Sequence, residues 1–189
     1  MLEQTIMKLK DILQENHFPP EAQKEILSWG VEELYKPQAQ AIEKGILTGK
    51  NLLMSVPTAA GKTLIAELCM LKSILLNGGR CLYIAPLKAL ASEKFNDFKR
   101  KYTPLNIKVG LAIGESSIPN QQLNRYQILV ATAEKVDSLL RSKATWLIQS
   151  LSVVILDEIH FINDGSRGPT MEILTARIKQ LSKNIQSSP

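Results

Sequence analysis

The stretch Ser55–Leu68, SVPTAAGKTLIAEL, determines how the rest of the chain is interpreted. It contains Gly61-Lys62-Thr63, the ending of a phosphate-binding loop, followed by an apolar helical pattern. The first glycine of the usual G-x-x-x-x-G-K-[ST] motif is missing, because Val56 occupies that position. On their own, these residues favour a phosphate-binding loop, with the ordinary start of a helix as the alternative. The other parts of a nucleotide site must therefore be sought elsewhere in the sequence.

Two kinds of segment alternate along the chain after this loop begins. Short, continuous apolar runs typical of buried strands occur at residues 51–56, 81–86, 107–113, 126–132 and 151–158. Patterns typical of helices occur at residues 62–79, 87–102, 133–142 and 169–181. Strands that are apolar throughout and alternate with helices are typical of a parallel sheet that is buried on both sides. The sequence therefore predicts an α/β fold with a mostly parallel sheet covered by helices on both faces.

The N-terminal part of the chain has helical patterns only. We expect helices over residues 3–15, after Pro19-Pro20, and over residues 36–50, the last closing near Gly49. We divide the chain into an N-terminal helical segment, residues 1–33, and a main domain, residues 34–189. The longest loop-like stretch in that domain is GESSIPNQQLNR, residues 114–125. The sequence ends where a further helix-to-strand connection is expected, which indicates a piece of a longer protein.

Composition limits the class of protein without identifying it. The 189 residues, 44% of them hydrophobic, are enough for one globular domain. No apolar run approaches the roughly 18 residues of a membrane span, and the N-terminus does not resemble a signal peptide. Cys69 and Cys81 lie in apolar runs and are expected to be buried free thiols. We expect an intracellular protein, and the net charge of +5 permits a polyanionic partner without establishing one.

A phosphate site needs backbone N–H groups, the positive end of a helix dipole and a cation. The turn before Lys62, placed between an apolar run and a helix, supplies the first two. Lys62 would reach the β- and γ-phosphates of a nucleotide, and the Thr63 hydroxyl would ligate Mg²⁺. The predicted nucleotide-binding loop consists of Pro57, Thr58, Ala59, Ala60, Gly61, Lys62 and Thr63.

A second motif decides between a nucleotide site and an ordinary helix start. Asp157 and Glu158 lie at the end of the strand-like segment at residues 151–158. Alone they are compatible with a solvated strand end, but a buried strand that ends in two carboxylates is costly unless something binds them. Asp157 is suited to the Mg²⁺ shell, and Glu158 to orienting and deprotonating a water that attacks the γ-phosphate. Together with Lys62 on the same predicted sheet, they indicate an ATP and Mg²⁺ site.

Asp157–His160 spells D-E-x-H, and with VPTAAGKT it resembles the first motor domain of a superfamily-two DExH helicase. In that family the loop often reads A-P-T-x-x-G-K-T, so Val56 replaces an alanine and no glycine is expected there. The resemblance implies a RecA-like P-loop NTPase fold for residues 34–189. It also implies that His160 relays between the nucleotide and a neighbouring motif, although an ordinary histidine at a strand end would look the same.

Further segments point to the Ski-like branch of these helicases, and among them to the archaeal Hjm-type DNA repair helicases. LYKPQAQAIEKG, residues 34–45, resembles the Q-motif, which implies that Gln38 reads the adenine ring; a glutamine on a helix surface is the alternative. Residues 85–94 resemble motif Ia, and residues 131–141 resemble a later strand-contacting motif. SRGPTMEIL, residues 166–174, also matches the family, with Arg167, Gly168 and Glu172 in familiar places.

In that family, two strand-to-helix junctions hold the backbone of one nucleic-acid strand. The resemblance assigns this role here to Pro86, Lys88 and Ala89 at one junction, and to Thr132 and Lys135 at another. N–H groups and lysines at such junctions are suited to phosphate contacts. For both lysines, an ordinary solvated surface position is the alternative.

The resemblance implies an enzyme: the ATP-binding motor domain of an ATP-dependent 3′-to-5′ DNA helicase that translocates on single-stranded DNA during repair or fork processing. Its partners would be single-stranded or forked DNA and the second RecA-like domain of the same parent chain. It would act in the cytoplasm, or in the nucleus of a eukaryote, and not at a membrane. Motifs III to VI and the second motor domain are absent from these 189 residues, so we expect the isolated chain to be weakly active or inactive.

Two alternatives remain open from the sequence. An RNA helicase or ribonucleoprotein-remodelling ATPase of the same branch would use the same site, because backbone contacts discriminate poorly between DNA and RNA. A nucleotide-binding module that does not hydrolyse ATP is the other. Glu158 argues against that second alternative, since a degenerate site often loses its catalytic carboxylate.

Overall fold

The computed structural model describes residues 7–54, 61–114, 120–142, 147, 150–158, 173–174 and 176–177. The chain forms two compact units, Met1–Gly78 and Gly79–Pro189, which are described separately. The predicted boundary between residues 33 and 34 concerns a different division of the chain, and it stays a prediction. None of the helices in the described ranges is both long and apolar enough to cross a bilayer.

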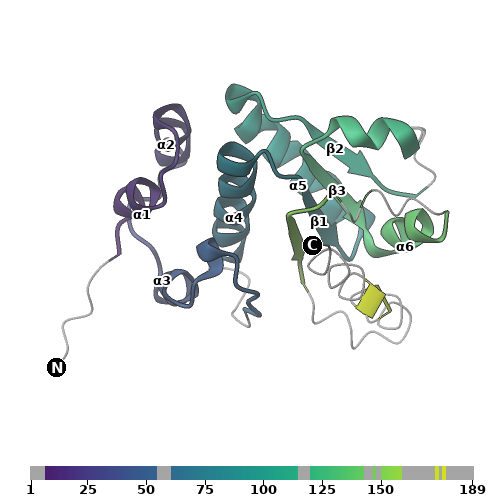
Figure 1. The fold of residues 1–189 in the computed structure, drawn as a ribbon, viewed down its shortest axis with the longest axis horizontal. Coiled ribbons are helices and arrows are strands. Elements are labelled where there is room, and N and C mark those ends of the chain that lie inside the picture. Colours follow the sequence, from purple (N-terminus) through teal and green to yellow (C-terminus); the bar gives the residue numbers. More distant parts are fainter. Residues whose placement is uncertain are drawn as a thin grey trace, which may run out of the picture. The chain divides into compact units, whose positions relative to one another are not determined.

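The first unit is helical in its described part. It contains α1 (Leu9–Glu15), α2 (Pro20–Leu27), α3 (Lys36–Glu43), the 3-10 helix η1 (Ile46–Thr48) and α4 (Lys62–Asn77) (Figure 1). Helix α2 begins at Pro20, where the missing proline N–H is not needed. The Lys72 ammonium on α4 donates hydrogen bonds to Asn16 Oδ1 at 2.9 Å and to the Leu47 carbonyl at 2.8 Å. This one side chain therefore ties α4 to the segments that follow α1 and α3.

Two predictions for this unit differ from the structure. The helix predicted over residues 36–50 is interrupted at Gly45, whose φ of 87° is left-handed, so α3 and η1 are separate elements. Residues 51–54, the described part of the strand predicted at 51–56, form no strand. A strand needs a neighbour for its backbone hydrogen bonds, and none of the four described strands pairs with this segment. Leu53 is 71% exposed there.

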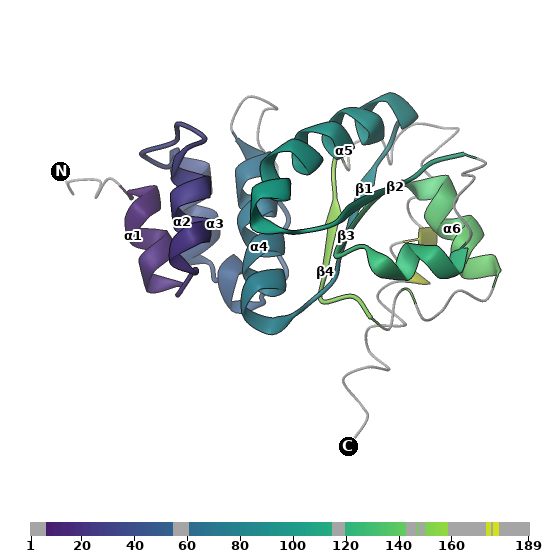
Figure 2. The same cartoon turned by 90° about the horizontal axis from the view of Figure 1, so that it is seen from above.

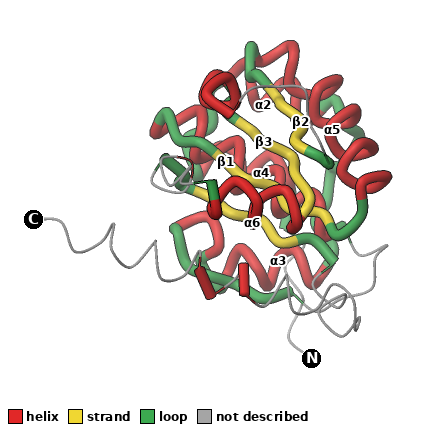
Figure 3. The backbone as a smooth tube through the Cα atoms, turned by 90° about the vertical axis from the view of Figure 1, so that its right-hand side faces the viewer, coloured by secondary structure: helices red, strands yellow, loops and turns green. Residues whose placement is uncertain are grey.

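The second unit contains the parallel sheet that the sequence predicts. Its strands are β1 (Cys81–Ala85), β2 (Val109–Ala112), β3 (Ile128–Thr132) and β4 (Val153–Leu156), in the order β2-β3-β1-β4 (Figure 3). All three pairings are parallel. The residues of β1 and β3 are buried throughout, which explains their continuous apolar sequences.

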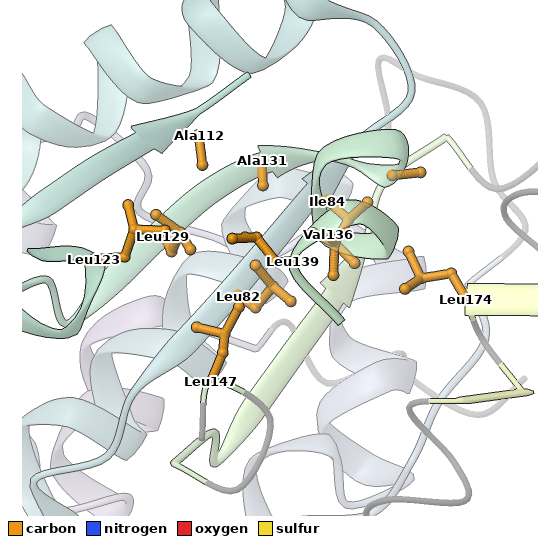
Figure 4. Close-up of a cluster of buried hydrophobic side chains, with 11 residues drawn as sticks. Leu82, Ile84, Ala112, Leu123, Leu129, Ala131, Val136, Leu139, Leu147 and Leu174 are labelled. Atoms are coloured by element: carbon orange, nitrogen blue, oxygen red, sulfur yellow. The ribbon is translucent and has the colours of Figure 1, made fainter. Parts of the chain in front are cut away.

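Helices cover both faces of this sheet, as predicted. Helix α5 (Lys88–Tyr102) lies along one face, and α6 (Ala133–Arg141) lies on the other (Figure 2). On the α6 face, Val136 and Leu139 pack with side chains from the strands in a buried apolar cluster (Figure 4). That cluster contains Leu82, Ile84, Ala112, Leu123, Leu129, Ala131, Ala133, Val136, Leu139, Leu147 and Leu174.

Polar side chains organise the amino ends of the strands. The Arg80 guanidinium donates to the Tyr126 carbonyl at 2.9 Å and to the Leu123 carbonyl at 3.1 Å. Burial lowers the pKa of Arg80 from its usual value. Leu123 belongs to the 3-10 helix η4 (Asn120–Arg125), which occupies part of the predicted loop at residues 114–125. Arg80 therefore fixes this segment against the start of β1.

Both cysteines are free thiols. Cys81 is buried at the start of β1. Cys69 is partly buried on α4, and burial raises its pKa to about 12, although the nearby Lys72 charge acts in the opposite direction. The prediction of buried free thiols is confirmed for Cys81, whereas Cys69 is free but only partly buried.

Candidate nucleotide and nucleic-acid site

The end of the phosphate loop is built as the sequence predicts. Gly61 has φ 71° and ψ 31° and caps α4, whose first two residues are Lys62 and Thr63. The helix that follows is 16 residues long, so its amino end combines N–H groups and a partial positive charge. Lys62 and Thr63 are thus at the place where a helix binds phosphate. The rest of the loop, Val56 and residues 57–60, lies outside the described residues.

Gln38 is brought directly to this loop. Its side chain is buried, and its Nε2 donates to the Gly61 carbonyl at 3.0 Å. Its Oε1 accepts the Tyr35 N–H at 2.8 Å, which caps the start of α3. A Cβ atom at position 61 would lie 2.1 Å from Gln38 Nε2. The resemblance to the Q-motif predicted that Gln38 binds the adenine ring. Its contact with the loop and its capping hydrogen bond appear only in the structure.

The carboxylates lie at the end of β4. The Asp157 N–H donates to the Ile84 carbonyl at 2.9 Å, so pairing with β1 extends beyond the strand. Asp157 Oδ1 accepts the Glu158 N–H at 2.9 Å, and Oδ2 accepts the Tyr83 hydroxyl at 2.5 Å. Glu158 has a left-handed φ of 50°, an uncommon conformation for a residue other than glycine. Backbone outliers of this kind cluster at functional sites.

Several predicted residues fall outside the described part of the chain. His160, the predicted relay, lies there, as do Arg167, Gly168 and Glu172. The two carboxylates and the phosphate loop belong to different compact units, and each half of the predicted site is described in its own unit.

The residues present are suited to ATP and Mg²⁺. Mg²⁺ is usually held by one or two carboxylates together with substrate phosphates, and not by a complete protein cage. Asp157 offers a hard oxygen ligand, and its carboxylate is held by hydrogen bonds from the Tyr83 hydroxyl and the Glu158 N–H. A Cβ at position 61 would collide with the Gln38 amide, so the buried contact between Gln38 and this end of the loop requires glycine there. The donor set therefore fits a nucleotide-bound magnesium ion.

The two predicted nucleic-acid junctions are adjacent at the same edge of the sheet. The register pairs Ala85 with Thr132, so the β1–α5 and β3–α6 junctions lie side by side. Ile84 pairs with Leu156, so Asp157 emerges at the same edge. Carboxyl ends of parallel strands are where open α/β sheets bind ligands. The structure thus brings three predicted segments together within the second unit.

The side chains at these junctions differ in exposure. Lys88 and Ala89 are exposed in the first turn of α5, whereas Pro86 is buried. The Lys88 ammonium lies near Gly114, where a Cβ would be 3.2 Å from its Nζ. Thr132, which caps α6, is only 2% exposed. Lys135 is partly exposed in the first turn of α6.

The parallel sheet, the glycine-capped helix and the carboxylate at the strand end define a RecA-like nucleotide-binding motor domain. A sequence profile described as DEAD/DEAH box helicase matches residues 35–188. The chain belongs to the DEAD/DEAH box helicase family.

Relatives with established names are similar over most of this chain. The ATP-dependent DNA helicase Hel308 of Methanocella arvoryzae is 51% identical over 161 residues, which cover 83% of this chain and 22% of that protein. Hel308 of Pyrococcus abyssi is 44% identical over 171 residues, covering 90% of this chain and 22% of that protein. The chain therefore spans about a fifth of the length of these relatives. The resemblance to a Ski-like, Hjm-type helicase motor domain is confirmed.

Solved structures agree on the fold. The crystal structure of the DUF1998 helicase MrfA matches with a TM-score of 0.75 and 26% identity, covering 90% of this chain and 28% of that one. MrfA bound to DNA and AMPPNP matches with a TM-score of 0.74 and 26% identity, covering 90% of this chain and 25% of that one. The predicted α/β RecA-like fold is confirmed.

Proposed function

We propose that this chain is the ATP-binding motor domain of an ATP-dependent DNA helicase, which translocates 3′ to 5′ on single-stranded DNA in repair or fork processing. The observation that carries the proposal is the strand register. It aligns the predicted Mg²⁺ ligand Asp157 with both predicted nucleic-acid junctions at one edge of one sheet. The names of the Hel308 relatives support DNA as the polymer and ATP as the nucleotide.

On this proposal, each half of the site has a distinct task. Lys62 neutralises charge on the β- and γ-phosphates, while N–H groups at the start of α4 hold them. Thr63 and Asp157 would hold Mg²⁺, which would supply positive charge beside the β- and γ-phosphates when bound. Glu158 orients a water molecule and accepts its proton during attack on the γ-phosphate. Gln38 binds the adenine ring, and its hydrogen bond to the Gly61 carbonyl couples the bound base to the phosphate loop. His160 relays nucleotide binding to the neighbouring motif.

The nucleic-acid side of the proposal uses the two junctions. Lys88 and Lys135, with N–H groups near Pro86, Ala89 and Thr132, contact the phosphodiester backbone of one strand. The second RecA-like domain of the parent protein closes on this domain when ATP binds, and hydrolysis releases it. Single-stranded or forked DNA is the proposed substrate, inside the cell.

The test is ATP hydrolysis by the full-length protein with matched single-stranded DNA and RNA. We expect strong stimulation by DNA and little by RNA. Equal or greater stimulation by RNA would instead support an RNA-remodelling enzyme with the same site residues. The variant Glu158→Gln is expected to bind ATP with unchanged affinity and to lose hydrolysis. If its hydrolysis were unchanged, Glu158 would not be the base.

A further inference from the structure

The hydroxyl of Tyr83 requires an explanation that the sequence did not provide. Tyr83 lies in the middle of β1, in the apolar run CLYIAP, and is 1% exposed. Burying a hydroxyl that makes no hydrogen bond costs free energy, so a tyrosine is tolerated at this position because its hydroxyl has an acceptor. That acceptor is Asp157 Oδ2, at 2.5 Å. The ring of a phenylalanine would pack in the same way. What the tyrosine adds is the hydroxyl, and this hydroxyl donates to Asp157.

The strand register explains how two residues so far apart in sequence meet. Tyr83 pairs with Ile155, and alternate residues of a strand share a face. Asp157, two residues after Ile155, therefore returns to the face of Tyr83. The neighbouring side chains Leu82 and Ile84 point to the other face, into the apolar cluster under α6 (Figure 4).

An aromatic row on α5 holds the Tyr83 ring in place. The ring packs edge-to-face on Phe98, with centroids 5.1 Å apart and planes at 80°. Phe98 in turn stacks on Tyr102, at 5.4 Å and 18°. All three rings are buried, and a tyrosine has only two side-chain torsions, so this packing fixes the direction of the hydroxyl.

The Asp157 carboxylate is held from both sides. Oδ2 accepts the Tyr83 hydroxyl, while Oδ1 accepts the Glu158 N–H at 2.9 Å. A carboxylate has about four acceptor positions, so these two bonds leave it able to bind a metal as well. Hydrogen bonds to a ligating carboxylate orient it, and their loss typically reduces metal affinity or activity by about 10- to 100-fold.

We propose that Tyr83 is a positioning residue, which holds the Asp157 carboxylate in the orientation that binds the Mg²⁺ of the nucleotide. The proposal rests on the proposed function, because it needs Asp157 to be a metal ligand. It goes beyond the sequence motifs, since Tyr83 belongs to none of the predicted site residues. It also assigns a role to α5 that does not involve nucleic acid, namely to support the Tyr83 ring.

The test compares Tyr83→Phe with Tyr102→Phe in the full-length protein. Both variants remove one buried hydroxyl from the same aromatic row, but only the first removes the donor to Asp157. The readout is Mn²⁺ binding that depends on a nonhydrolysable ATP analogue, measured by electron paramagnetic resonance. Metal-free analogue binding and the thermal unfolding midpoint are measured in parallel, together with the Mg²⁺ concentration that gives half-maximal hydrolysis.

We expect Tyr83→Phe to weaken analogue-dependent Mn²⁺ binding about 10- to 100-fold and to raise the Mg²⁺ requirement. Metal-free analogue binding should be unchanged, and Tyr102→Phe should resemble the unsubstituted protein. Unchanged Mn²⁺ affinity in Tyr83→Phe, or an equal loss in Tyr102→Phe, would overturn the proposal. An unsubstituted protein that binds Mn²⁺ as expected but is not stimulated by DNA would contradict the proposed function alone. If it showed no analogue-dependent Mn²⁺ binding, both proposals would be overturned.

Discussion

At the level of single residues, Gly61 is restricted by two independent features. Its φ of 71° is left-handed, and a Cβ would lie 2.1 Å from Gln38 Nε2. The first feature costs other residues roughly 1–2 kcal/mol. The second displaces a buried amide that contacts both α3 and the phosphate loop. The two effects can be separated, because α4 ends in a glycine of similar conformation.

We predict that Gly61→Ala lowers the free energy of unfolding by more than Gly78→Ala and weakens ATP binding at least about tenfold. Gly78 caps the other end of α4 with φ 62°, and a Cβ there would meet nothing within 4 Å. Both variants therefore introduce the same backbone strain, but only Gly61→Ala displaces Gln38. Urea unfolding and titration with a fluorescent ATP analogue measure the two effects. Equal losses in both variants would show that the contact with Gln38 is unimportant.

A second prediction concerns the Gln38 amide group. Gln38→Glu keeps an oxygen for the Tyr35 N–H but places another acceptor against the Gly61 carbonyl. An unmade buried hydrogen bond of this kind costs about 1–3 kcal/mol, so we expect that loss of stability together with weaker nucleotide binding. Gln40→Glu makes the same chemical change at an exposed position of α3 and should alter stability by less than about 0.5 kcal/mol. Calorimetric unfolding of the two variants gives the comparison.

The sequence predicted single residues well where a local motif determines them. Gly61, Lys62 and Thr63 lie at the start of a helix because glycine, loop and helix follow one another directly. The Tyr83 hydroxyl could not be predicted, because its acceptor is 74 residues away and is reached only through the register of β1 and β4. Contacts of that kind depend on which strands are neighbours, and strand order is not encoded locally.

At the level of elements, the same distinction holds. The predicted segments coincide with strands β1, β3 and β4 and with helices α4, α5 and α6. Each of these strands is a continuous apolar run, and each of these helices has an unbroken helical pattern with clear ends. The break at Gly45 was missed because a glycine inside a helical pattern is often tolerated. The strand predicted at residues 51–56 depended on a neighbour, and an apolar run alone does not supply one.

Helix α6 carries a buried carboxylate that pairs with arginines both on the helix and outside it. The buried Asp137 accepts from Arg141 on the same helix at 2.7 Å and from Arg177 at 3.0 Å. We predict that Asp137→Asn lowers the free energy of unfolding by about 1–2 kcal/mol, between the values for exposed and fully buried ion pairs. Urea unfolding of this variant beside Arg141→Gln, which removes only the pair within the helix, measures it. Equal losses would indicate that the link to Arg177 contributes nothing.

Asp97 on helix α5 makes a pH-dependent contribution to the stability of the folded chain. Burial on its own raises the pKa of Asp97, but hydrogen bonds and charges from Lys101 and Arg100 outweigh it, so the pKa is lowered. A lowered pKa means that the folded state gains stability above the unfolded pKa, near 3.9, and loses that gain as the pH falls through the folded value. Asp97→Asn should therefore cost about 0.2–1 kcal/mol at neutral pH and almost nothing well below pH ~4.

Urea unfolding of Asp97→Asn at the two pH values provides the measurement. Glu93→Gln, at an exposed position on the same helix, is the control for removing a negative charge. A difference between Asp97→Asn and the unsubstituted chain that persisted in acid would mean that Asp97 stabilises α5 by packing and not by charge.

At the level of the whole molecule, the chain contains one motor domain of proteins about five times its length. On the proposed function, the second motor domain would supply an arginine to this site, and an arginine finger is worth about 10³–10⁵ in rate where one is used. We predict that the isolated 189-residue chain hydrolyses ATP at less than about 1 s⁻¹, with or without DNA. Phosphate release assays on the chain and the full-length protein, at equal concentration, test this. Faster turnover by the chain would show that its own residues suffice.

The state of the two thiols has a practical consequence for such experiments. With Cys81 buried in β1 and the Cys69 thiol protonated far above neutral pH, the folded chain holds almost no reactive thiolate. Maleimide dyes should therefore not react with either native cysteine until the protein unfolds. A single cysteine introduced at exposed Glu93, on the helix that begins with Lys88, would carry the only label. Strand engagement could then be followed by fluorescence on an otherwise native sequence.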